Sequence, residues 1–401
     1  MEKNATRRIY LDNAATTRLS PQVLEQMMPC LTDVYGNASS VHSFGRDAAA
    51  YVEKARSQVA EAIGAKKNEI YFTAGGTESD NWAIKGAAFA QQKKGRHIVT
   101  SAIEHHAVLH TCQGLEKQGF EVTYVSPGSD GIVCAKDIEA AIRPDTILVT
   151  VMTANNEIGT IQPIAEIGAI CRARKVYFHT DAVQAVGHIP IDVVDMNIDM
   201  LSLSAHKFYG PKGVGALYIR SGVRINSLIE GGAQERGKRA GTENPAAVVG
   251  MGAAIEIAVR DMAKNSVHES ALRDRLFDKI ISEIPHVVVN GSRQEGKRLP
   301  GNVNVSIRFI EGEGMLLLLD MQGIAASSGS ACTSGSLDPS HVLLAIGLDH
   351  ETSHGSLRLT LSHDNTEDDI DRTVEILSKS IERLRAMSPL FKQSEGGVQN
   401  V

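Results

Sequence analysis

The sequence predicts an α/β protein, with a large domain built on a mainly parallel seven-stranded sheet and a smaller α+β domain. Length gives the first reason, because 401 residues exceed the roughly 250–300 that one hydrophobic core supports. Patterning gives the second, because β-branched or aromatic runs alternate with helical patterns between about residues 69 and 219. After about residue 262 the pattern changes to charged amphipathic stretches and short strands, which is typical of an α+β unit.

Each strand of the large domain is a short run rich in β-branched or aromatic residues. The expected strands are residues 69–73, 98–100, 121–125, 146–151, 176–179, 200–203 and 215–219. Helices are expected to begin at Thr77 and near His105. Right-handed crossovers place the loops after parallel strands along one edge of the sheet, where such sheets bind ligands.

The smaller domain is expected to contain three helices and two strands. They are helices 266–283, 315–319 and 366–385, and strands 287–289 and 302–308. The predicted division assigns residues 16–261 to the large domain, and residues 1–15 and 262–401 to the small one.

Charge and hydropathy exclude several classes of partner. The chain has 41 Lys and Arg against 47 Asp and Glu, so its net charge is −6 and predicts no direct binding of nucleic acid. No apolar run reaches the roughly 18 residues of a membrane span, and no apolar segment follows the charged first residues. We therefore expect a cytoplasmic protein without a membrane partner.

The cysteines argue against a disulfide framework. They are Cys30, Cys112, Cys134, Cys171 and Cys332. Their number is odd and none forms a C-x-x-C pair, so a cysteine-based zinc site is not expected either. Free thiols of this kind suit a reducing compartment.

Two familiar motifs match only in part. Residues 232–238 fit G-x-x-x-x-G-K, but Arg239 follows where a P-loop needs Ser or Thr for Mg²⁺. Residues 204–207 fit the S-x-x-K of serine penicillin-binding enzymes, but S-D-N precedes them at 79–81 and K-T-G is absent. A serine hydrolase therefore stays a weak alternative.

Three loop segments after predicted strands carry polar residues. In the first, Gly75 and Gly76 allow close backbone approach, and Thr77 can cap a helix whose N-terminus suits a phosphate. An ordinary strand–turn–helix would look the same. The second places Asp181 at the end of an apolar strand, where a cationic ring nitrogen or a helix N-terminus could pair with the carboxylate.

The third segment places Lys207 directly after an apolar strand, in a turn rich in Gly and Pro. Partial burial would lower the pKa of this amine and make it a nucleophile for an aldehyde, although most lysines simply lie on the surface. A phosphate cradle, an Asp for a pyridinium nitrogen and a reactive Lys together are what pyridoxal 5′-phosphate requires. The combination predicts that cofactor far more specifically than any single segment.

Several segments along nearly the whole chain resemble motifs of the NifS/IscS-type cysteine desulfurases. They are residues 10–17 (YLDNAATT), 77–81 (TESDN), 155–159 (NNEIG), 204–213 (SAHKFYGPKG) and 239–242 (RAGT). Residues 327–332 (SSGSAC) resemble the active-cysteine loop of that family. The resemblance implies a fold type I pyridoxal-phosphate enzyme, related to class V aminotransferases, that works as a homodimer. Its large domain would bind the cofactor, and its small domain would carry the active-cysteine loop.

The resemblance also implies a role for each site residue. His105 would stack on the cofactor ring, Asp181 would pair with the ring nitrogen, and Gln184 would pair with the phenolic oxygen. Thr77, Ser204 and His206 would hold the phosphate, and Thr242 would reach it from the other subunit. Gly76 is also expected to bind the cofactor.

The same resemblance assigns the substrate contacts. Asn156 would lie beside Gln184, and Arg358 would bind the substrate carboxylate with Asn37 nearby. Lys207 would bond the cofactor, be displaced by cysteine and then move the substrate Cα proton. His105 would act as the acid–base group for the substrate thiol.

The implied activity converts L-cysteine to L-alanine and leaves the sulfur as a persulfide on Cys332. The acceptors would serve iron–sulfur cluster assembly through a scaffold protein of the IscU/NifU type, or the synthesis of other sulfur-containing cofactors or thiolated RNA. A transient iron–sulfur cluster held through Cys332 is a further expectation. The alternatives are a selenocysteine lyase or a related class V aminotransferase. Housekeeping IscS proteins usually end in an aromatic and His-containing tail, whereas residues 396–401 look more NifS-like.

The residues around Cys332 in the sequence differ in composition from those around the other four cysteines. Residues 327–336 are almost wholly Ser, Gly, Thr and Ala, so this segment is expected to be exposed and mobile. The other four cysteines have surroundings that favour small buried hydrophobic residues.

Overall fold

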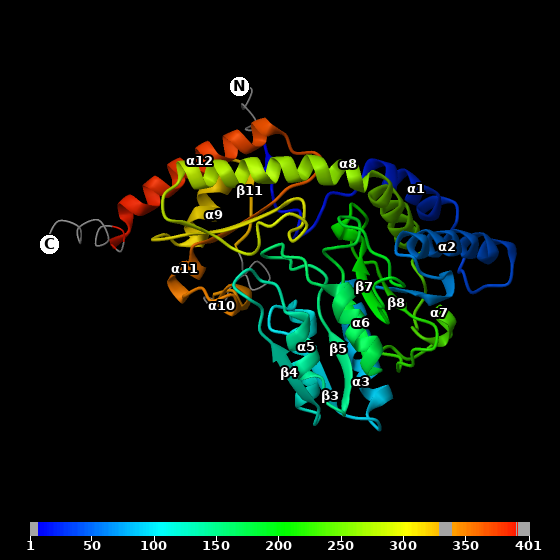
Figure 1. Ribbon diagram of the computed structural model, residues 1–401. Helices are drawn as coiled ribbons and strands as arrows, with labels where there is room; N and C mark the ends of the chain where they lie inside the picture. Colours follow the sequence, from blue (N-terminus) through cyan, green and yellow to red (C-terminus); the bar gives the residue numbers. More distant parts are fainter. Residues whose placement is uncertain (1–6, 329–338, 390, 392–401) are drawn as a thin grey trace.

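The computed structural model describes residues 7–328, 339–389 and 391, and its centre is a seven-stranded sheet (Figure 1). The strand order is β2-β8-β7-β6-β5-β3-β4, and only β8 runs antiparallel to its neighbours. The strands are β2 Ile70–Thr73, β3 His97–Ser101, β4 Glu121–Val125, β5 Thr146–Thr150, β6 Tyr177–Asp181, β7 Met200–Ser204 and β8 Gly215–Ile219. The predicted mainly parallel sheet is confirmed.

Helices cover both faces of this sheet, which explains why its strands read as nearly continuous apolar runs. Ile98, Leu148 and Met200 pack in one apolar cluster with residues of α3 and α4. Their chain neighbours Val99, Val149 and Leu201 pack in a second cluster with α2, α6 and the first half of α8. The helices of this part are α1 Pro21–Thr32, α2 Ser43–Ala62, α3 Gly76–Gln91, α4 His106–Glu116, α5 Ala135–Ala141, α6 Ile164–Arg174 and α7 Gln234–Gly237.

A second, smaller part contains an antiparallel sheet in the order β12-β10-β9 and the short parallel pair β1-β11. Its strands are β1 Ile9–Tyr10, β9 Val287–Val289, β10 Asn302–Ile307, β11 Ile324–Ala325 and β12 Ser356–Thr360. Its helices are α9 Gly312–Met321, α10 His341–Ala345, α11 His350–His354 and α12 Glu367–Met387. A capping box of Thr366 and Asp369 starts α12, which lies within two residues of the expected helix 366–385.

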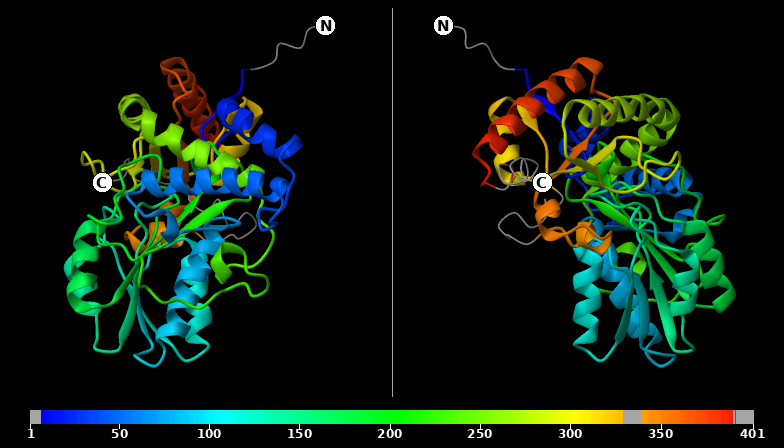
Figure 2. Two further views of the ribbon diagram at one scale, coloured as in Figure 1. Left: turned by 90° about the vertical axis from the view of Figure 1, so that its right-hand side faces the viewer. Right: turned by 60° about the vertical axis from the view of Figure 1, so that its left-hand side comes forward.

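One long helix, α8 Pro245–Glu283, connects the two parts (Figures 1 and 2). The expectation of a helix beginning at 266 was wrong by some twenty residues, because the true start has Pro245 in its first turn and the Asn244 side chain as its cap. The first half of α8 packs in the large core, and the second half packs with the small sheet. The proposed division at residue 262 therefore falls inside this helix, between two apolar clusters, and stays a proposal.

Candidate active site

A cavity of about 270 Å³ lies where β6, β7 and the N-terminal end of α3 meet. Its walls include ten of the residues expected to bind the cofactor or substrate. They are Gly76, Thr77, His105, Asn156, Asp181, Gln184, Ser204, His206, Lys207 and Arg358. The crossover rule places Asp181 and Ser204 at one sheet edge, because β6 ends at Asp181 and β7 ends at Ser204.

The N-terminus of α3 forms one side of the cavity. The helix begins at Gly76, and its cap residue Gly75 has φ +155°, a conformation that side-chain-bearing residues rarely adopt. No side chain caps this helix, so the expectation that Thr77 is the cap was wrong and Thr77 lies one position inside. Uncapped N–H groups beside Ser204 and His206 suit a phosphate.

Lys207 ends a short 3₁₀ turn, Ala205–Lys207, that follows β7 directly. Its Nζ donates to the backbone carbonyls of Ala14 at 2.6 Å and Ala15 at 2.8 Å. The same N-terminal segment receives the Gln184 amide, whose Nε2 donates to the Ala14 carbonyl at 2.9 Å. Ala14 and Ala15 thus form a wall of the site to which the sequence motif alone assigned no role.

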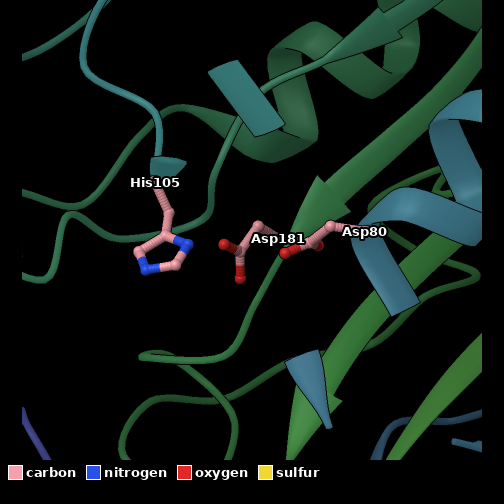
Figure 3. A group of neighbouring side chains, drawn as sticks. All are labelled: Asp80, His105 and Asp181. Atoms are coloured by element: carbon pink, nitrogen blue, oxygen red, sulfur yellow. The ribbon is translucent and has the colours of Figure 1, made fainter. Parts of the chain in front are cut away.

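Asp181 forms the acidic end of the cavity together with His105 and a residue that sequence reasoning missed, Asp80 (Figure 3). One ligand atom from each of the three lies within 4.8 Å of the others. Burial raises the pKa of Asp181, while the Val183 N–H at 2.9 Å and the nearby Lys207 amine oppose that rise. An ionisable acid in this position suits a protonated ring nitrogen.

His105 is the N-cap of α4, as the predicted helix start implies, and its Nδ1 accepts from the Ala107 N–H at 3.1 Å. Burial and the nearby Lys207 lower the pKa of His105 to about 4. The ring is therefore neutral at pH 7, with its hydrogen on Nε2. A neutral ring can stack on an aromatic cofactor and exchange a proton through Nε2.

Arg358 on β12 reaches the cavity from the small part of the molecule and is only 2% exposed. Its Nη2 lies 3.0 Å from the Asp12 carboxylate, and its Nη1 donates to the Asn156 carbonyl at 3.2 Å. Its buried Nε has no hydrogen-bond partner in the described part of the chain. A substrate carboxylate could use this remaining donor.

Three expected site residues do not lie in the walls of this cavity. Asn37 and Thr242 are both exposed, and the Asn37 side chain accepts from the Ser39 N–H. Cys332 falls outside the described residues. Among the other cysteines, Cys112 and Cys171 are buried as expected. Cys30 is only half-buried and Cys134 is exposed at the start of α5, so the expected burial of these two was wrong.

The residues present fit pyridoxal phosphate. The uncapped helix N-terminus with Ser204 and His206 suits the phosphate, Asp181 suits the ring nitrogen, and Lys207 suits the aldehyde. Each of these groups is placed at one cavity by a different element, so the fit does not depend on one loop.

Fold and cavity together define a pyridoxal-phosphate enzyme of the aminotransferase type. The family described as "Aminotransferase class-V" matches residues 9–373, which is most of the chain, so the protein belongs to that family. Within that family, the chain belongs with the cysteine desulfurases, as the following relatives show.

A "Cysteine desulfurase IscS" of Clostridium botulinum is 58% identical over 96% of this chain and 97% of the relative. One from Methanosarcina thermophila is 55% identical over 95% of this chain and 94% of that relative. A solved "NIFS-LIKE PROTEIN" superposes with a TM-score of 0.89 at 39% identity, covering 94% of this chain and all of that one. The predicted family and cofactor are confirmed. None of the helices in the described ranges is both long and apolar enough to cross a membrane.

Proposed function

We propose that this cysteine desulfurase converts L-cysteine to L-alanine and delivers the sulfur as a persulfide on Cys332 to acceptors for iron–sulfur cluster assembly. The observation that supports it best is the gathering of Lys207, Asp181 and Arg358 around one cavity. These groups supply an amine, an acid and a carboxylate-binding guanidinium in one place. Other sulfur-containing cofactors and thiolated RNA stay as further destinations of the sulfur.

Each residue of the cavity has a separate task. The cofactor, when bound, withdraws electrons from the substrate Cα and weakens its Cα–H and Cβ–S bonds. Arg358 binds the substrate carboxylate and Asn156 lies beside it. Lys207 removes and returns the proton at Cα, and His105 exchanges a proton with the substrate thiol.

Sulfur leaves in a displacement at the substrate sulfur atom. The Cys332 thiolate attacks that atom, an S–S bond forms and the Cβ–S bond breaks. The bonding electrons stay on Cβ, which takes up a proton as alanine forms. The outer sulfur of the persulfide is at the oxidation level of neutral sulfur, and an acceptor thiolate removes it. We also propose that a transient iron–sulfur cluster binds through Cys332 during transfer.

A homodimer completes the site in this proposal. Large apolar side chains are exposed on α1 and in the segment that leads into α2, with Tyr35 at 75% and Val41 at 89% exposure. The others are Leu24, Met28 and Leu31 on α1 and Phe44 in the first turn of α2. Several exposed apolar side chains in one stretch of the chain favour a protein interface there, and Asn37 lies in the same stretch. Thr242, exposed and away from the cavity of its own chain, would reach the phosphate of the other subunit.

The proposed partner is an iron–sulfur scaffold protein of the IscU/NifU type, and the proposed compartment is the cytoplasm. The net charge of −6 supports neither direct nucleic-acid binding nor attachment to an anionic membrane. Pull-down of partners from the native cell would identify the sulfur acceptor, and recovery of a scaffold of another kind would change this part of the proposal.

Cys332→Ala tests the proposed sulfur carrier. The variant should bind the cofactor and cysteine, which the visible spectrum reports, but should neither accumulate persulfide nor release alanine efficiently. Matched Ala variants of Cys30, Cys112, Cys134 and Cys171 serve as controls and should keep turnover. Normal turnover in Cys332→Ala, with loss in one of the controls, would show that another thiol carries sulfur.

Product analysis separates the alternative activities. Sulfide and alanine should appear from cysteine without any keto acid, whereas an aminotransferase would need one. Borohydride reduction should fix the cofactor on Lys207, and peptide mapping to another lysine would contradict the assigned site. Faster turnover of selenocysteine than of cysteine would instead favour a selenocysteine lyase.

A further inference from the structure

Asp80 is a buried acid beside the cofactor end of the cavity, and none of the steps above uses it. It is the fifth residue of α3, is 1% exposed and lines the same cavity as Asp181. In Figure 3 the Asp181 carboxyl lies between the His105 ring and the Asp80 carboxyl. Two carboxyl groups this close in a buried site cannot both ionise cheaply.

The basic side chain paired with Asp80 in the described part of the chain is His179, whose Nε2 lies 3.7 Å from Asp80 Oδ1. Burial lowers the pKa of His179 to about 3, so this ring is neutral. Its nitrogens are already used, Nδ1 with the Thr150 hydroxyl at 2.8 Å and Nε2 with the Ser202 hydroxyl at 3.0 Å.

Most of the influences on Asp80 favour its protonated form. Asp181 and the buried Glu104 add negative potential, and desolvation is the largest cause of the strongly raised pKa of Asp80. Only a hydrogen bond with Ser202 acts in the opposite direction. Asp80 Oδ1 is buried with no hydrogen-bond partner among the described residues, which a carboxylate tolerates poorly.

We propose that Asp80 is a positioning residue that keeps its proton and presents a neutral carboxyl to Asp181, which leaves Asp181 as the single negative charge at the cofactor's ring nitrogen. The charge then matches the one proton of a pyridinium ring. A second carboxylate would repel Asp181 and disturb its orientation. The proposal rests on the proposed cofactor site, but the protonation of Asp80 belongs to the protein itself.

Infrared difference spectra of the cofactor-free protein test the protonation directly. At pH 7, Asp80→Asn should lose one protonated-carboxyl band relative to the wild type, because Asn has no such group. Glu269→Gln is the matched control, since it alters a buried acid outside this cavity and should leave cofactor affinity unchanged. An unchanged set of carboxyl bands in Asp80→Asn would show an ionised Asp80 and overturn the proposal.

Cofactor affinity, measured by titrating the cofactor-free protein with pyridoxal phosphate, tests the positioning role. Asp80→Asn should bind within about threefold of the wild type, because it keeps a neutral hydrogen-bonding group of the same shape. Asp80→Ala should bind about 10–100-fold more weakly, as is typical when an outer partner of a ligand-binding group is removed. Wild-type affinity in Asp80→Ala, or an equal large loss in Asp80→Asn, would overturn the role.

The infrared and affinity measurements distinguish a failure of this proposal from two other possible failures. If Asp80→Ala does not fold, the infrared and affinity results for Asp80→Asn still decide the proposal. If the wild-type protein binds no pyridoxal phosphate, the proposed function fails, while the infrared result still reports whether Asp80 carries a proton.

Discussion

Arg358 already makes two hydrogen bonds before substrate binds, and its remaining donors are available for a carboxylate, which makes its replacement informative. Asp12 and the Asn156 carbonyl hold two of its nitrogens. Arg358→Lys keeps the charge but loses the planar arrangement of donors that binds a carboxylate with two hydrogen bonds. We expect the KM for cysteine to rise about tenfold or more, which corresponds to roughly 1.4 kcal/mol or more of lost binding.

The visible absorption of the bound cofactor should be unchanged in Arg358→Lys, because Arg358 contacts the substrate rather than the cofactor in our proposal. Arg260→Lys is the control, since Arg260 lies on the exposed side of α8 paired with Asp261. An unchanged KM in Arg358→Lys would place the carboxylate-binding group elsewhere.

The burial of Glu269 leads us to expect that the stability of the folded protein depends on pH. Burial raises the pKa of this carboxyl from 4.5 to about 8 in the folded protein. The folded state then binds the extra proton, so stability is lost as pH rises from about 4.5 to about 8. Glu269→Gln removes that loss, and it should raise the melting temperature clearly at pH 8.5 and little at pH 5.

Thermal unfolding of Glu269→Gln and wild type at the two pH values measures this difference. The expected effect at pH 8.5 is of the order of a few kcal/mol, because one pKa unit corresponds to about 1.4 kcal/mol. Glu295→Gln, in an exposed loop, should shift neither melting temperature. An equal gain at both pH values would mean that the carboxyl does not titrate in this range.

At the scale of elements, a buried acid, Glu157, is one of the groups that attach α10 to the large part of the molecule, beside the apolar contacts of α10 with Ile103 and Ile158. Ser340, the N-cap of α10, donates to Glu157 Oε2 at 2.5 Å. The side chains of Asn302 and Asn304 donate to the Glu157 backbone carbonyl at 3.1 and 3.0 Å. The NNEIG segment therefore connects the cavity residue Asn156 with both α10 and β10.

A double-mutant cycle tests this attachment. Glu157→Ala should lower the free energy of unfolding by about 1–3 kcal/mol, because Ser340 loses its buried partner. Adding Ser340→Ala should cost less in Glu157→Ala than in the wild type, with a coupling of about 1 kcal/mol. Urea unfolding measures both, and Ser282→Ala on the exposed side of α8 should be additive with Glu157→Ala. Full additivity with Ser340→Ala would exclude the direct contact.

Helices and strands with a clear pattern of apolar and polar residues could be predicted from the sequence, whereas those without one could not. The seven strands of the large sheet, and β9 and β10 of the small one, were predicted to within two residues, because each is a short apolar run between turns. The strands β1, β11 and β12 were not predicted. The first half of α8 was missed since residues 246–255 are buried all round and show no polar periodicity. Lys207 and Asp181 could be found because Asp181 ends an apolar strand and Lys207 comes three residues after the end of the next one. The carbonyls of Ala14 and Ala15 could not, because backbone contacts over about 190 positions leave no trace in side-chain pattern.

At the scale of the whole molecule, one chain provides most of a site but not all of it. The cavity has its amine, acid and guanidinium, yet Thr242 and Asn37 are exposed and outside its walls. Asn37 lies among the exposed apolar side chains of the α1–α2 segment. A homodimer would bury that apolar surface and bring the missing residues to a neighbouring site in one step.

Mixed dimers decide whether Thr242 acts across the interface. A dimer of one Lys207→Ala chain and one Thr242→Ala chain should contain one intact site, because the chain that keeps Lys207 receives a normal Thr242 from its partner. Co-expressed chains with two different affinity tags give this dimer, and its cofactor content and alanine release should be about half those of the wild type. If Thr242 serves its own chain, each site carries a defect and the mixed dimer should be no better than the two parent variants. That result would place the phosphate contact within one subunit, and the apolar surface on α1 would then need another partner.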